Sequence, residues 1–315
     1  MSDNRAPDTR RLNLGGRDRR ILAGFVAMTD QVPRNARMAG RISATPVRYP
    51  FSFLIAGDSG AWPDPTADAI FAQLLRQIAD VRPAPVFFAH LGDFAGPGTV
   101  ARHQHYLELA SSLEIPNVSL IGNHDLEDPV AGAAWTAVHG PRTFHFAHGT
   151  TRFVAIDGAS GQAGDLGDTT PPDTAGPSVE ALAYLDETLA ATAEPNRVVL
   201  LHAPPHLGGH YAPQPECGFR QGEPEFLDIV RRHGVRLVCC AHGLGFDHHI
   251  HDGIRFVMSG GGGAALYLSY RNAGPDRGAL FHAVEITLDE RGAARGRVLQ
   301  AFAAPDSPPP FAFAD

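Results

Sequence analysis

The chain has 315 residues, of which 43% are hydrophobic and 19% charged, so it is long enough to bury a globular core without disulfides. Its net charge of −8 argues against a protein that coats nucleic acid, because such proteins need a basic face that releases counterions. No apolar segment approaches the ~20 residues that cross a bilayer, which argues against a membrane protein.

The cellular compartment is predicted from the cysteines and the amino terminus. Cys239 and Cys240 are adjacent in an apolar run and point in opposite directions on a strand, so they do not pair with each other. Cys217 is then left alone, which fits a reducing compartment. The first residues lack the apolar core of a signal peptide. We therefore expect a cytoplasmic protein.

Composition divides the chain into three parts. Residues 1–48 are rich in Arg and interrupted by Pro and Gly, and we expect a poorly ordered arm with one short helix near residues 21–28. Residues 49–305 hold the alternating apolar segments of a folded domain, and residues 306–315 form a C-terminal tail.

Within the folded domain, strands and helices are predicted to alternate. Five segments are each predicted to be an apolar strand followed by a loop, and they are residues 50–60, 85–93, 117–125, 197–206 and 235–243. Helical spacing predicts helices at residues 66–81, 99–113, 179–193 and 224–233. A hairpin is predicted around Gly149, a long loop over residues 157–178, and antiparallel strands at residues 254–263, 280–289 and 295–304. The alternation predicts an α/β fold in which helices cover the sheets.

Polar side chains follow five of the predicted strands. These strands end in the sequences GDSG, GDF, GNHD, HAPPH and AHG. Ligands of open α/β sheets bind outside the carboxyl ends of strands, so five loops are expected to bring their side chains together. Three oxygen donors and two imidazoles suit Mn, Fe or Zn better than Ca or Mg. The candidate metal ligands are Asp58, Asp93, Asn123, His202 and His242.

The ordered blocks around these residues resemble those of the calcineurin-like metallophosphoesterases, and most of all their purple-acid-phosphatase-like branch. The similarity covers residues 51–265, and the GNHD block is its most specific part. This resemblance implies a four-layer αββα sandwich of two mixed β-sheets flanked by helices. It also implies hydrolysis of a small phosphorylated substrate, a phosphomonoester or a phosphodiester, by a metal-activated hydroxide.

Individual roles are carried over from the resemblance. Asp93 would bridge two metal ions, and Asn123, His202 and His242 would complete one of the two sites. Asp58 would bind the other ion. His124 would contact phosphate or protonate the leaving group, and Asp125 would orient His124 by accepting a hydrogen bond.

The sequence departs from the family pattern at three positions where relatives carry metal ligands, namely Gly60, Gly96 and Leu244. We therefore expect one tightly bound metal ion and a second, weaker one. Histidines elsewhere in the chain are alternative ligands, although such residues are more often ordinary strand or surface residues. They are His103, His105, His248, His249 and His251.

Two other functions stay open at this point. A degenerate family member would bind one metal ion or a phosphorylated ligand with little activity. A GDSL-type esterase would use Ser59 as nucleophile, but no Asp in this chain has the required His three residues later. A chelator distinguishes the metallophosphoesterase from the GDSL-type esterase, because it inhibits only the metal-dependent enzyme. The sequence specifies neither the substrate nor the oligomeric state.

Overall fold

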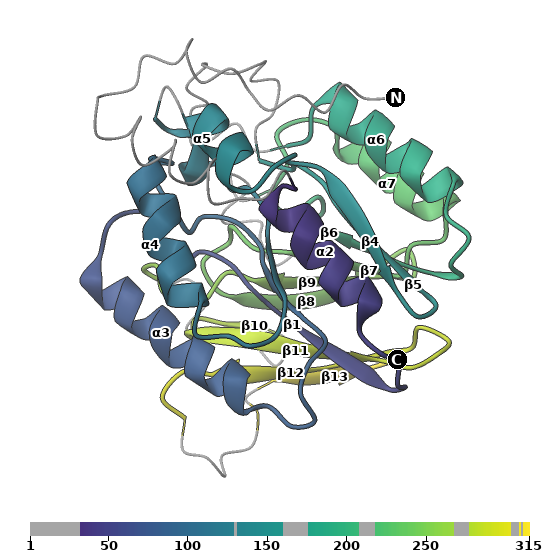
Figure 1. Cartoon of the computed structure of the whole chain (residues 1–315). Helices are drawn as coiled ribbons and strands as arrows, with labels where there is room; N and C mark the ends of the chain where they lie inside the picture. The colour runs from purple at the N-terminus through teal and green to yellow at the C-terminus, as the bar shows by residue number, and fades with distance from the viewer. Residues whose placement is uncertain are drawn as a thin grey trace.

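The computed structural model describes residues 32–128, 131–159, 176–207, 218–267, 277–303, 309 and 311–315. Two mixed β-sheets pack face to face, and helices cover their outer faces (Figure 1). The first sheet has the order β13 (Ala312–Ala314), β12 (Ala294–Gln300), β11 (His282–Leu288), β1 (Phe51–Ala56), β2 (Phe88–His90) and β3 (Asn117–Ser119). The second has the order β10 (Arg277–Gly278), β8 (Phe246–His251), β9 (Ile254–Ser259), β7 (Leu237–Cys240), β6 (Asn196–Leu200), β5 (Thr151–Ala155) and β4 (Phe144–His148).

Each sheet combines parallel and antiparallel strands, with the parallel ones on one side of the first sheet and at the centre of the second. Strands β1, β2 and β3 are parallel, as are β5, β6, β7 and β9, while β4, β8 and β11 to β13 pair antiparallel. The first sheet packs against α3 (Pro65–Asp80), α4 (Val100–Ala110) and α5 (Ala131–Val138). The second packs against α6 (Val179–Ala190) and α7 (Glu223–Arg232). The predicted four-layer αββα sandwich is confirmed.

The main core lies between the two sheets and is aromatic at its centre. The ring of Phe53 on β1 stacks on Phe87 with centroids 5.0 Å apart and meets Phe153 of the opposite sheet edge-on at 5.2 Å. Full burial of one such side chain contributes roughly 1.5–3 kcal/mol. Cys239 contacts this inner core and Cys240 the core beneath α6 and α7, so the two thiols point in opposite directions as predicted.

The predicted arm is wrong for its last part, because helix α2 (Arg34–Ala44) belongs to the folded body. Ile42 is completely buried, and Asn35 pairs with the edge of β3 by donating to the Ser119 carbonyl (2.8 Å) and accepting from its N–H (3.1 Å). The Arg34 guanidinium donates to Ser119 Oγ (3.3 Å) and to Asn117. Buried polar groups that find partners do not oppose folding. The expected helix near residues 21–28 lies outside the described residues.

The predicted C-terminal tail is also wrong in part. Strand β13 extends the first sheet by pairing with β12, and the Asp315 carboxylate accepts from the Arg255 guanidinium at 2.5 Å. Phe313 stacks on the ring of His248 with centroids 4.5 Å apart. The end of the chain is therefore fixed to the second sheet as well as to the first.

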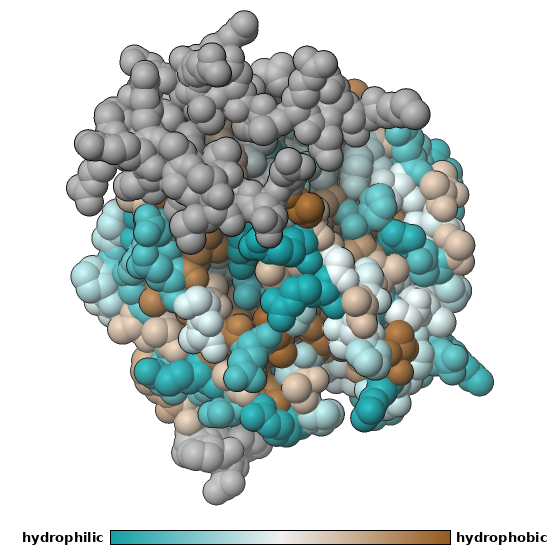
Figure 2. Space-filling view, viewed as in Figure 1, coloured by the Kyte–Doolittle hydropathy of each residue, from teal (hydrophilic) through white to brown (hydrophobic). Residues whose placement is uncertain are grey.

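Hydrophobic residues occur in small groups among hydrophilic ones on the face shown in Figure 2. Among the described residues, no helix has the length and hydrophobicity needed to cross a bilayer.

The predicted helices and strands otherwise match those observed within a few residues, while α5 and β8 were not expected.

Candidate metal centre

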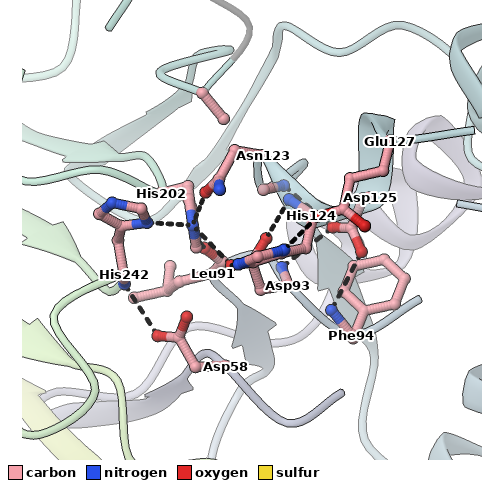
Figure 3. Close-up of polar contacts among 12 residues, drawn as sticks. Asp58, Leu91, Asp93, Phe94, Asn123, His124, Asp125, Glu127, His202 and His242 are labelled. Carbon is pink, nitrogen blue, oxygen red and sulfur yellow. Dashed lines mark hydrogen bonds and ion pairs between the residues drawn. The ribbon is translucent and has the colours of Figure 1, made fainter. Parts of the chain in front are cut away.

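The five predicted ligands follow the carboxyl ends of five parallel strands. They lie two to four residues beyond β1, β2 and β3 of the first sheet and two residues beyond β6 and β7 of the second. The structure brings these five side chains together; four of them, Asp58, Asp93, Asn123 and His202, are buried, and His242 is half-buried (Figure 3).

Three of the ligands have unusual backbone conformations. The φ angle is +60° at Asp58, +59° at Asp93 and +66° at His242, in the left-handed region that side chains other than glycine rarely adopt. Such residues cost about 1 kcal/mol or more and persist where the surrounding structure determines them, which is frequent at functional sites. Leu244 in the His242 loop has a φ of +38°.

His202 lies at the middle of the centre. Its Nδ1 is 2.7 Å from the Leu91 carbonyl oxygen, to which it donates. Its Nε2 is 3.0 Å from Asn123 Oδ1, 3.2 Å from His242 Nδ1 and 3.2 Å from Asp93 Oδ2. Asn123 Oδ1 and Asp93 Oδ2 offer electron pairs, and His242 Nδ1 offers one in one of its two tautomers, so the group can hold a cation, whether proton or metal, among its atoms.

The charges of the buried side chains also favour a cation beside His202. Burial alone would lower the pKa of His202, but the nearby Asp93 and Asp58 carboxylates raise it to about 9. Burial opposes ionisation of Asp93, yet His202, His124 and His242 together hold its pKa below the usual range. The centre therefore stabilises positive charge next to an ionised Asp93.

Asp58 has a different environment. Burial, reinforced by Asp93, raises the pKa of the Asp58 carboxyl well above its ordinary value. Its Oδ2 accepts the His242 backbone N–H at 2.8 Å, while Oδ1 is buried and has no hydrogen-bond partner among the described residues. A buried oxygen without a donor fits a cation ligand. A metal ion would relieve the repulsion between Asp58 and Asp93.

The donor set matches a transition metal. Ligand atoms of Asp93, His202 and His242 lie within 4.8 Å of one another, and Asn123 adds an amide oxygen. Two glycines permit this close approach. A Cβ on Gly122 would lie 2.1 Å from Asp93 Oδ1, and a Cβ on Gly92, whose φ is +103°, would lie 2.5 Å from His202 Nδ1. Two imidazoles with a carboxylate and an amide suit Mn, Fe or Zn.

The role expected for Asp125 is wrong. Its carboxylate does not orient His124 but accepts four backbone N–H groups, at 2.8 to 3.1 Å, from Asp93, Phe94, Ala95 and Gly122. Burial and the Asp93 charge raise the pKa of Asp125 to about 6. Asp125 therefore fixes the loop that carries Asp93, from a position behind the site.

Glu127 makes the contact that was expected of Asp125. Its Oε1 is 2.5 Å from His124 Nδ1, across one turn of the short helix η2 (His124–Leu126) and the residue after it. His124 Nε2 then lies 4.0 Å from Asp93 Oδ2, and the side chain is 20% exposed. The sequence analysis missed Glu127, although its spacing of three residues from His124 is that of helical neighbours. His124 thus faces both the centre and solvent.

The usual ligand positions that are glycine here have no room for a side chain. A Cβ on Gly60 would lie 2.7 Å from the Phe94 carbonyl oxygen, and a Cβ on Gly96 would lie 1.8 Å from that of Ala61. The alternative histidines contact residues outside the centre: His103 with His139, His105 with Asp68, His248 with Phe313, His249 with Asp247 and His251 with His206. His248, His249 and His251 lie on strand β8, as the sequence favoured, while His103 and His105 lie on helix α4.

Ser59 is placed poorly for a nucleophile. It is 3% exposed, and its Oγ is 2.8 Å from Nε2 of the fully buried His90. Burial lowers the pKa of His90 to about 3, and Phe71 and Phe94 contact its ring edge-on. His90 is a hydrogen-bonded core histidine, and Ser59 is too deeply buried to meet an acyl ester.

Comparisons with known proteins agree with this architecture. The family model described as calcineurin-like phosphoesterase matches residues 51–245. A search of curated proteins gave no match. Solved structures with a similar fold include the purple acid phosphatase PPD1 from yellow lupin (Lupinus luteus) seeds, with a TM-score of 0.63 and 15% identity over 84% of this chain and 53% of that one.

Two further structures share the fold. GAP50, the anchor in the inner membrane complex of Plasmodium, has a TM-score of 0.59 and 12% identity over 84% of this chain and 88% of that one. PhoD has a TM-score of 0.55 and 12% identity over 85% of this chain and 69% of that one. This chain spans about half the length of the lupin protein, so these likenesses establish the fold.

Proposed function

Because the chain belongs to the calcineurin-like phosphoesterase family, we propose that it is a metal-dependent hydrolase of phosphate esters. The observation that carries this proposal is the convergence of Asn123, His242 and Asp93 donor atoms on Nε2 of His202, within 3.2 Å. Such a group of donor atoms can hold a metal ion, and the family uses bound metal ions for phosphoester hydrolysis. The substrate is a small phosphorylated molecule, a monoester or a diester.

Four residues hold the tightly bound ion in this proposal, namely Asp93, Asn123, His202 and His242. Asp58 would hold a second ion weakly, together with Asp93, because Gly60, Gly96 and Leu244 supply no ligand. Mn, Fe or Zn suits these donors. When bound, such ions act as Lewis acids on phosphoryl oxygens and lower the pKa of water.

The protein positions the other groups. The Leu91 carbonyl fixes the ring of His202, since Nδ1 donates to it at 2.7 Å. Glu127 contacts Nδ1 of His124, which directs Nε2 toward the side of Asp93. His124 donates a proton from Nε2 to the leaving-group oxygen, a task typically worth about 10²–10⁴-fold in rate.

The test compares the hydrolysis of an aryl phosphate by wild type, Asp93→Asn and Asp68→Asn after addition of Mn, Zn or Fe. Asp68 contacts His105 away from the centre, so Asp68→Asn is the matched control. We expect Asp93→Asn to lose activity and most of its metal, and the control to keep both. Full activity with unchanged metal content in Asp93→Asn would overturn the proposal.

A second candidate is a family member that binds one metal ion and hydrolyses poorly. The absence of side chains at Gly60 and Gly96 favours it, because the second site then depends on Asp58, Asp93 and water. Such a protein would bind one ion per chain and leave the aryl phosphate intact at every metal concentration. The same assay therefore separates the two candidates.

A further inference from the structure

An exposed tryptophan lies beside the proposed proton donor. Trp62 follows Asp58 by four residues, and its ring centroid is 5.2 Å from that of His124, at an interplanar angle of 63°. Trp62 is 56% exposed. A large aromatic side chain at the mouth of a polar centre offers an apolar surface to whatever enters it.

Position and support distinguish Trp62 from the other exposed apolar side chains. Two of the large exposed apolar side chains among the described residues are aromatic, namely Trp62 and Phe302. Phe302 follows the end of β12. The loop before Trp62 is fixed by two backbone hydrogen bonds, from Gly60 N to the Asp93 carbonyl (2.9 Å) and from Gly96 N to the Gly60 carbonyl (3.1 Å). Trp62 therefore has a supported backbone next to the metal ligands.

We propose that Trp62 forms a stacking subsite for a planar aromatic group on the leaving-group side of the substrate, such as a nucleobase or an aryl ring. The proposal rests on the proposed function, in which His124 protonates the leaving-group oxygen. The group attached to that oxygen then lies next to the ring that contacts His124. Every planar base or aryl ring has a face that can stack on tryptophan, so the subsite selects for planarity.

Fluorescence tests the subsite without relying on catalysis. The chain has two tryptophans, and Trp135, on α5, is completely buried in the core between the helices and the first sheet. Adenosine monophosphate and ribose 5-phosphate make a matched pair of probes, with and without the planar base. We expect the first to quench the emission of the metal-loaded protein and the second to leave it unchanged. Trp62→Phe, which retains Trp135, should lose this quenching.

Kinetics tests the same subsite in the reaction. Trp62→Ala should lower kcat/KM for adenosine monophosphate by about five- to twentyfold, the lower part of the range for stacking on one aromatic residue, because Trp62 is partly open to water. It should change kcat/KM for ribose 5-phosphate less than twofold. Trp62→Phe should restore most of the loss, and the control Phe302→Ala should match wild type for both esters.

The outcomes separate this inference from the function on which it rests. Equal effects of Trp62→Ala on both esters, or wild-type kcat/KM values that do not favour the base, would overturn the subsite while leaving the hydrolase in place. Quenching by adenosine monophosphate that depends on Trp62, in a metal-loaded protein that hydrolyses neither these esters nor aryl phosphate mono- and diesters, would support the subsite and contradict the proposed function. Absence of both the quenching and all of this hydrolysis would contradict both.

Discussion

Replacing Asp125 by Asn tests whether this carboxylate fixes the loop that carries the shared ligand. Asp125 Oδ2 accepts the N–H groups of Asp93 and Gly122, and Oδ1 accepts those of Phe94 and Ala95. Asparagine has the same shape, but one oxygen becomes an NH₂ group, which donates. In either orientation of the amide, two buried N–H groups lose their acceptor and face a donor.

The expected loss of stability is large. A hydrogen bond to a charged acceptor contributes about 1.5–3 kcal/mol, so loss of two costs roughly 3–6 kcal/mol of the free energy of unfolding, which is partly offset because asparagine removes a buried charge that the folded protein disfavours. Domains of this kind are stable by about 5–15 kcal/mol, so Asp125→Asn should fold but unfold at much lower denaturant concentration. Displacement of Asp93 should also reduce the metal content.

Urea unfolding of chelator-treated protein at pH 7.5 measures this effect, since Asp125 is ionised above its pKa of about 6. Asp64→Asn is the matched control. Asp64 caps α3 by accepting one bond, from Thr66 N at 2.8 Å, and asparagine caps a helix about as well as aspartate. The control should stay within about 0.5 kcal/mol of wild type. An Asp125→Asn variant that unfolds within about 1 kcal/mol of wild type would refute the role of Asp125.

Single changes at other positions have separable expected effects. His124→Ala should lower kcat by about 10²–10⁴-fold and keep its metal by elemental analysis; loss of metal instead would make His124 a ligand. Ser59→Ala should retain most phosphoesterase activity, and trapping of an acyl group on Ser59 would revive the esterase. Leu244→His should tighten the second metal ion in titrations, and an unchanged affinity would show that this position does not reach it. Burial lowers the pKa of His103 to about 3, so the unfolded chain binds more protons below pH ~6.5 and stability is lost as pH falls. Between pH 7.5 and 5.5 this residue alone should cost about 1.4 kcal/mol by urea unfolding, and His103→Gln should lack that share.

Apolar runs and helical spacing follow directly from burial, so the sequence pattern predicted sheets covered by helices. The four-layer arrangement was implied by the family resemblance. The sequence did not predict that α2 belongs to the folded body, because its residues Arg34 and Asn35 are polar and yet buried. Their burial depends on acceptors and donors of β3, which local pattern does not reveal. Strand β13 was missed for a similar reason, since a short edge strand becomes visible only through its pairing with β12.

The candidate ligands could be predicted because each follows a strand and has a metal-binding side chain. The supporting contacts could not, since they depend on where a side chain points. Asp125 and Glu127 both lie near His124 in sequence, yet the Asp125 carboxylate turns toward backbone N–H groups and the Glu127 carboxylate toward the imidazole. Trp62 carried no signal in the sequence beyond its closeness to Asp58, and its contact with His124 is a tertiary one.

The measurement that tests the central claim most directly is stepwise restoration of metal to chelator-treated protein. Bound metal per chain and aryl phosphate hydrolysis are followed together at each addition of Mn, Zn or Fe. The proposed centre predicts one tightly bound ion, a second and weaker ion, and hydrolysis that is absent without metal and appears as metal is bound. Hydrolysis that persists in metal-free protein, or full metal occupancy without hydrolysis of any phosphate ester, would contradict it.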